Sequence, residues 1–119
     1  MNAVGRSILG NALFVAAVLF TGTALAAGSI TIIAPKDGAV LPSGSGNKLV
    51  YNVMLSPEGN HLHVYIDDDN PIIDHQVSGC PCTLDLPDLA PGKHVIAVKE
   101  ATVSHVLTGV QAQVTVRVR

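Results

Sequence analysis

Apolar and polar residues alternate along most of the chain after its first 26 residues, and helical spacing is absent there. Because successive side chains of a strand point to opposite faces of a sheet, this period of two predicts half-buried β-strands. The alternation is clearest at residues 48–55, 61–67 and 110–119, and shorter candidate strands lie at residues 29–33, 72–77, 83–86 and 94–99.

Turns rich in proline, glycine and aspartate separate these segments at intervals of roughly eight to twelve residues, which is typical of two-sheet sandwiches. We therefore expect an all-β chain, an immunoglobulin-like β-sandwich of about seven antiparallel strands. A barrel of similar strand number is the competing architecture. The chain has no tryptophan and only 3% aromatic residues, so its core must be mainly aliphatic.

The first 26 residues have the features of an export signal. Met1–Arg6 carries one positive charge, Ile8–Phe20 is almost wholly apolar, and Ala24-Leu25-Ala26 supplies small residues for cleavage. We expect cleavage after Ala26, leaving one domain of residues 27–119 in the periplasm or secreted medium. The protein would then contact the membrane only transiently, through the signal peptide at residues 1–26.

Charge and motifs exclude several classes of function. Without Arg6, six basic residues remain against nine acidic ones, a formal charge of −3, whereas a nucleic-acid-binding protein needs a basic face. The sequence has no nucleophile elbow and no glycine-rich phosphate loop before a helix. We expect a protein that is not an enzyme and does not bind nucleic acid.

Two histidines share one face of the predicted strand at residues 61–67. The alternation places His61 and His63 on one side and Leu62 and Val64 on the other. A His-x-His pair on a strand can supply two metal ligands, but it can equally be two polar residues on a solvated sheet face.

The loops of an immunoglobulin-like sandwich bring further donors to the same end as His61. If the His-x-His strand is the third of the sandwich, Cys80-Pro81-Cys82 and the loop that holds His105 lie at that end. Imidazole and thiolate donors suit copper or zinc. The candidate metal ligands are therefore His61, His63, His105, Cys80 and Cys82.

Cys80 and Cys82 allow three interpretations. In an oxidising compartment they can form a disulfide across one residue, which would be strained and easily reduced. They can instead be metal thiolates, or they can pair with another molecule. A disulfide would also make a thiol-redox role conceivable.

Two other histidines have structural explanations. His94 occupies a corner position before a strand, where we expect it to point inward and donate a hydrogen bond to nearby backbone. His75 is expected at the surface of a short edge strand.

Three short motifs resemble known exported domains. Leu89-Ala90-Pro91-Gly92-Lys93-His94 is similar to the Leu-x-Pro-Gly-x-Tyr motif of bacterial immunoglobulin-like and fibronectin-type-III-like modules, with His94 in place of tyrosine. The opening Ala34–Leu41 resembles that of many such modules, including periplasmic copper-resistance sandwiches. The segment Asn60–Asp67 resembles the His-Leu-His strand of other exported bacterial domains. The copper-resistance sandwiches usually begin with a histidine ligand, whereas this domain would begin at Ala27.

The resemblance implies an exported β-sandwich, and the residues add a candidate site. We therefore expect a binding or accessory module that holds copper or zinc through the His/Cys patch. The alternatives are a structural or protein-interaction module with a periplasmic protein partner and no metal, and a thiol-redox protein that uses Cys80 and Cys82.

Overall fold

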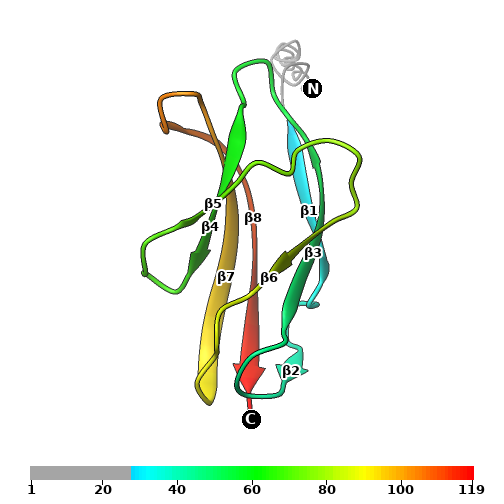
Figure 1. Ribbon diagram of the computed structural model, residues 1–119, viewed down its shortest axis with the longest axis vertical. Helices are drawn as coiled ribbons and strands as arrows, with labels where there is room; N and C mark the ends of the chain where they lie inside the picture. The colour runs from blue at the N-terminus through cyan, green and yellow to red at the C-terminus, as the bar shows by residue number, and fades with distance from the viewer. Residues whose placement is uncertain (1–27) are drawn as a thin grey trace, which may run out of the picture.

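The computed structural model describes residues 28–119, so the predicted export signal at residues 1–26 lies outside the described residues. This part of the chain contains eight strands and no helix (Figure 1). The strands are β1 (Ser29–Ala34), β2 (Val40–Leu41), β3 (Lys48–Met54), β4 (His61–Ile66), β5 (Ile72–Asp74), β6 (Cys82–Asp85), β7 (Gly92–Ala101) and β8 (Leu107–Val118).

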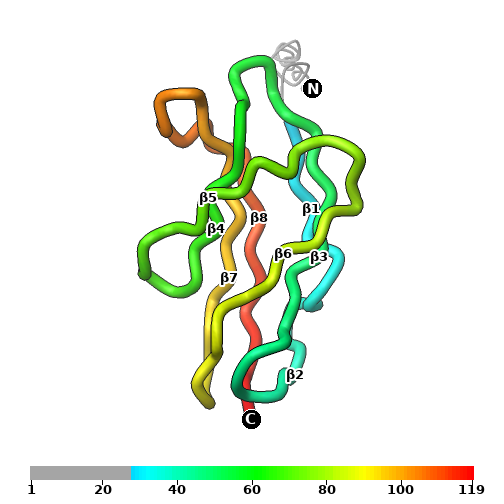
Figure 2. The backbone as a smooth tube through the Cα atoms, viewed as in Figure 1, coloured from blue at the N-terminus to red at the C-terminus, as the bar shows by residue number. Residues whose placement is uncertain are grey.

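The strands form two sheets. The smaller has the order β1-β3-β6 and the larger the order β2-β8-β7-β4-β5. All pairs are antiparallel except β2 with β8. The chain crosses from one sheet to the other between β5 and β6, as the tube in Figure 2 shows. The result is a sandwich in which β4 is flanked by β5 and β7.

The core lies between the sheets and is mainly aliphatic, as predicted. Most members of the core are residues that the alternation assigns to the inner face. Burying them removes apolar area from water, which stabilises the fold by about 25 cal/mol per Å². The core cluster includes Leu49, Tyr51, Leu62, Val64, Ile96, Val98, Val114, Val116 and Val118.

Two predicted boundaries differ from the structure. The alternation predicts strands that end at residue 99 and resume at residue 110, but β7 continues to Ala101 and β8 begins at Leu107. The pairing register shifts between Lys99 and Ala101, so β8 accommodates extra residues there as a bulge. The strand predicted at residues 72–77 is also shorter, because β5 ends at Asp74.

No helix long and apolar enough to span a membrane occurs among the residues that the structure describes.

Candidate metal centre

Three histidines meet at the end of the sandwich where β4 begins. His61 and His63 are the first and third residues of β4 and project from the outer face of the larger sheet. His105 lies in the turn between β7 and β8, which Figure 1 places beside the start of β4. We call His61, His63 and His105 the His triad. The structure thus brings together the three histidines that the sequence predicted as ligands.

The β7–β8 turn fixes the position of His105. The Thr102 carbonyl accepts a hydrogen bond from the His105 N–H (2.9 Å), and the Thr102 N–H donates to the Val106 carbonyl (2.9 Å). His105 adopts a left-handed backbone conformation with φ of 68°, which costs a non-glycine residue about 1–2 kcal/mol. The surrounding turn holds this conformation, and the imidazole is directed over β4.

The facing ring nitrogens form a nearly equilateral triangle. His61 Nε2 lies 3.1 Å from His63 Nε2 and 3.1 Å from His105 Nδ1, and the latter two atoms are 3.2 Å apart. Three such atoms have a common centre ~1.8 Å from each, so an ion at the Zn–N distance of about 2.0 Å would sit ~0.9 Å above their plane. The angle between two nitrogens at that ion would be ~103°, near the tetrahedral value of about 109°.

Protons alone cannot satisfy this triangle. Each facing nitrogen presents either an N–H or a lone pair, and a hydrogen bond needs one of each. Among three mutual neighbours, two must therefore be in the same state, which leaves one contact between two donors or two acceptors. A cation removes this conflict because it accepts a lone pair from all three rings.

Two neighbouring side chains orient the rings of β4. The Asn60 Oδ1 atom accepts a hydrogen bond from His61 Nδ1 (2.9 Å), which leaves the lone pair on Nε2. The Tyr65 hydroxyl lies 3.3 Å from His63 Nδ1, where it can accept a hydrogen bond and leave the lone pair on His63 Nε2. The Lys99 ammonium lies over the Tyr65 ring, 5.1 Å from its centroid. Such outer partners are typical of metal-binding histidines.

His61 and His63 are buried. The interpretation that they are polar residues on a solvated sheet face is therefore wrong, since their exposed fractions are 1% and 6%. The β7–β8 turn and adjacent histidines cover this part of the outer face. Burial, reinforced by the charge of His105, lowers the pKa of both rings. Both rings therefore stay neutral, as metal ligands must be, down to a lower pH than an exposed histidine does.

Glu100 supports this end of the sandwich and was missed by the sequence analysis. It is fully buried, and its carboxylate accepts hydrogen bonds from the Ser56 N–H (2.8 Å), the Ser56 hydroxyl (2.5 Å) and the Thr108 hydroxyl (2.6 Å). Burial alone would raise the pKa of Glu100, but these hydrogen bonds outweigh it and lower the pKa. Ser56 precedes His61 and Thr108 follows His105, so Glu100 ties together the two segments that carry the His triad.

The two cysteines do not join the His triad. Cys80 Sγ and Cys82 Sγ are bonded to one another, so neither sulfur offers a thiolate to a metal. Among residues 28–119 the group of close ligand atoms consists of the three histidines alone. The ligand set at this end is therefore smaller than the sequence analysis expected.

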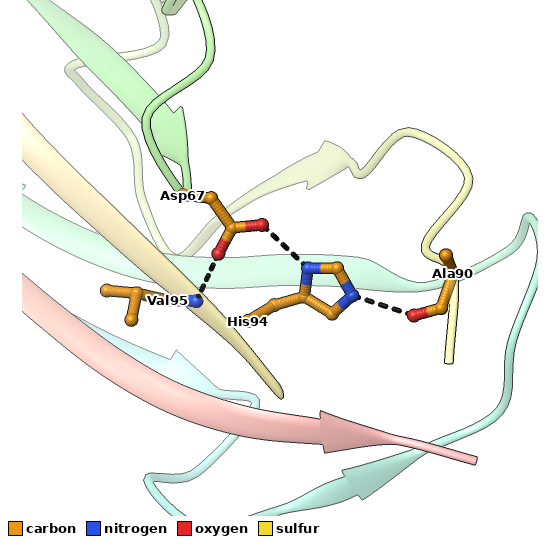
Figure 3. A network of polar contacts seen from close by, with 4 residues as sticks. All are labelled: Asp67, Ala90, His94 and Val95. Carbon is orange, nitrogen blue, oxygen red and sulfur yellow. Dashed lines mark hydrogen bonds and ion pairs between the residues drawn. The ribbon is translucent and has the colours of Figure 1, made fainter. Parts of the chain in front are cut away.

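His94 is engaged elsewhere, in the network drawn in Figure 3. Its Nε2 donates to the Ala90 carbonyl (2.7 Å), the backbone hydrogen bond that its corner position predicted, and its Nδ1 faces the Asp67 carboxylate at 2.7 Å. Asp67 also accepts the Val95 N–H (2.9 Å). The Ala90 carbonyl and then Asp67 raise the pKa of His94. These contacts join β7 to its neighbouring turns and leave His94 unavailable to a metal.

A solved structure supports the fold. No protein-family model matches the chain, and a search of curated proteins finds no significant match. The fibronectin(III)-like modules of Clostridium thermocellum CbhA superimpose with a TM-score of 0.61 at 16% identity, covering 76% of this chain and 96% of the module. The predicted immunoglobulin-like β-sandwich is confirmed.

Proposed function

We propose that the protein binds one copper or zinc ion through the His triad. The observation that carries this proposal is the triangle of ring nitrogens, with sides of 3.1–3.2 Å, which suits a single small cation and cannot be satisfied by protons. Imidazole nitrogen is a borderline donor preferred by copper and zinc over magnesium and calcium.

The surroundings also suit a resident ion. His61 and His63 are buried, their outer nitrogens are paired with Asn60 and Tyr65, and the pKa values of both rings are lowered, chiefly by burial. A cation would therefore meet neutral rings that need little rearrangement, which reduces the entropic cost of binding.

We further infer that the protein is an exported binding or accessory module and not an enzyme. The residues at 1–26 support export, and the sequence offers no nucleophile with a base beside it. The structural neighbour is itself described as a module, which is consistent with a binding or accessory role.

Titration of the protein, purified without a polyhistidine tag, with Zn²⁺ and Cu²⁺ against a chromophoric chelator tests the proposal. We expect one high-affinity ion per chain and a fall in affinity of more than about tenfold in His105→Ala. The matched control is Gln113→Ala, an exposed side chain of the same sheet. Equal affinities in all three proteins, or no binding by the unmodified protein, would rule the proposal out.

A further inference from the structure

A fourth histidine lies beside the His triad without belonging to it. The pairs Leu62–Asp74 and His63–Ile73 define the register of β4 with β5, and one further step places residue 75 opposite His61. Side chains of such a cross-strand pair are neighbours on one face of a sheet. The ring centroids of His61 and His75 are indeed 5.0 Å apart.

The backbone around His75 is anchored, but its ring is free. Asp74 is buried and accepts a hydrogen bond from the Tyr51 hydroxyl (2.6 Å), and the side-chain amide of Gln76 donates to the Thr83 carbonyl (3.0 Å). The His75 side chain, in contrast, is exposed and takes part in no hydrogen bond with any of residues 28–119. A change of side-chain rotamer can therefore redirect this imidazole without moving the chain.

The His triad leaves one coordination position to be filled. Three nitrogens held near tetrahedral angles leave a fourth direction open, and a tetrahedral ion fills it with a protein ligand or with water. The nitrogens of His75 lie outside the group of atoms within 4.8 Å of one another in this structure. The ring is nevertheless adjacent to His61, with 5.0 Å between the ring centroids, and a change of side-chain rotamer moves its nitrogens relative to the His triad.

We propose that His75 turns toward the ion and becomes its fourth ligand, so that the loaded protein has a closed site of four imidazoles. This inference rests on the proposed function, since it requires an ion at the His triad. A closed site excludes exchangeable water and holds the ion, whereas a three-histidine site keeps a position for water or substrate. Closure by His75 therefore assigns the protein to metal holding and not to metal-assisted hydrolysis.

Two readouts on the full protein test His75. Zn²⁺ affinity is measured by chelator competition, and water-proton relaxation is measured for the Cu²⁺-loaded protein, which reports water bound to the ion. His75→Ala is compared with Ser78→Ala, an exposed residue of the same linker, and with His75→Gln as a second variant. Far-UV circular dichroism confirms the fold of each variant.

We expect both His75 variants to lose about tenfold or more in Zn²⁺ affinity and to gain a relaxation signal that added imidazole suppresses. Ser78→Ala should match the unmodified protein in both measurements. If His75→Ala keeps its affinity and relaxation while His105→Ala does not bind, the His triad holds the ion and His75 is not a ligand. If the unmodified protein takes up no ion, the inference fails together with the proposed function.

Discussion

The Glu100→Gln substitution tests whether the buried carboxylate holds the end of the sandwich that carries the His triad. One carboxylate oxygen accepts the Ser56 N–H, and the other accepts the hydroxyls of Ser56 and Thr108. Glutamine has nearly the same shape but no charge, so the Ser56 and Thr108 hydroxyls must turn to accept from its NH₂ group, and weaker neutral hydrogen bonds replace the charge-assisted ones. Losing a hydrogen bond to a buried charged group costs about 1.5–3 kcal/mol.

For a domain of this size, each kcal/mol lowers the melting temperature by about 4–8 °C. We therefore expect Glu100→Gln to melt about 8–16 °C below the unmodified protein, taking about 2 kcal/mol as the central value. Urea unfolding should give a lower midpoint with an unchanged slope. The control is Glu58→Gln, which removes an exposed carboxylate from the same turn.

The pH dependence gives a second check. Because hydrogen bonds lower the folded pKa of Glu100 despite its burial, its contribution is present above the unfolded value of about 4.3 and is lost as the pH falls through the folded pKa. The difference between the two proteins should therefore shrink in acid. A Glu100→Gln protein within about 0.5 kcal/mol of Glu58→Gln at neutral pH would refute this account of Glu100.

Gly59 provides a double-mutant test of the same contact. A Cβ atom at Gly59 would lie 2.3 Å from Glu100 Oε2, and the three hydrogen bonds prevent the carboxylate from moving away. Gly59→Ala should therefore destabilise the protein, but less so in a Glu100→Ala background, where the clash is absent. Additive effects would show that the two residues do not press on each other.

Three further predictions concern pH and the disulfide. His94→Gln should lower the free energy of unfolding most between about pH 4 and 6.5. The pKa of His94 is raised, so its contribution to stability is lost as the pH rises through that pKa, and the pKa of Asp67 is lowered, so its contribution is lost as the pH falls. A pH-independent difference in urea titrations would contradict this. The double variant Cys80→Ser/Cys82→Ser should bind one Zn²⁺ with unchanged affinity, since neither sulfur contacts the His triad; a large loss in the chelator titration would restore the cysteines as ligands. Metal binding should persist below pH 6.5, because burial lowers the pKa values of both β4 histidines of the triad; release of the ion at or above that pH would argue against it.

The fold could be predicted from local pattern because its core obeys the period of two. Positions such as Leu62 and Val64 are inner residues in both the alternation and the structure. The same pattern placed His61 and His63 together on the outer face. It could not show that this face is covered, because the cover comes from a turn more than 40 residues later in the chain.

Glu100 is another residue whose burial the local pattern could not predict. Glu100 directly follows the strand predicted at residues 94–99, so the sequence pattern leaves it outside any strand. The structure instead buries it, because the bulge in β8 and the turn at Ser56 supply three donors that compensate for desolvation. Such compensation depends on contacts distant in sequence, and no local pattern indicates it.

Crystals of the protein grown with Zn²⁺ and measured at the zinc absorption edge test the central claim most directly. The account predicts one anomalous peak per chain, about 2.0 Å from His61 Nε2, His63 Nε2 and His105 Nδ1. A peak at any other position, or a triangle of ring nitrogens without an ion at saturating Zn²⁺, would contradict it.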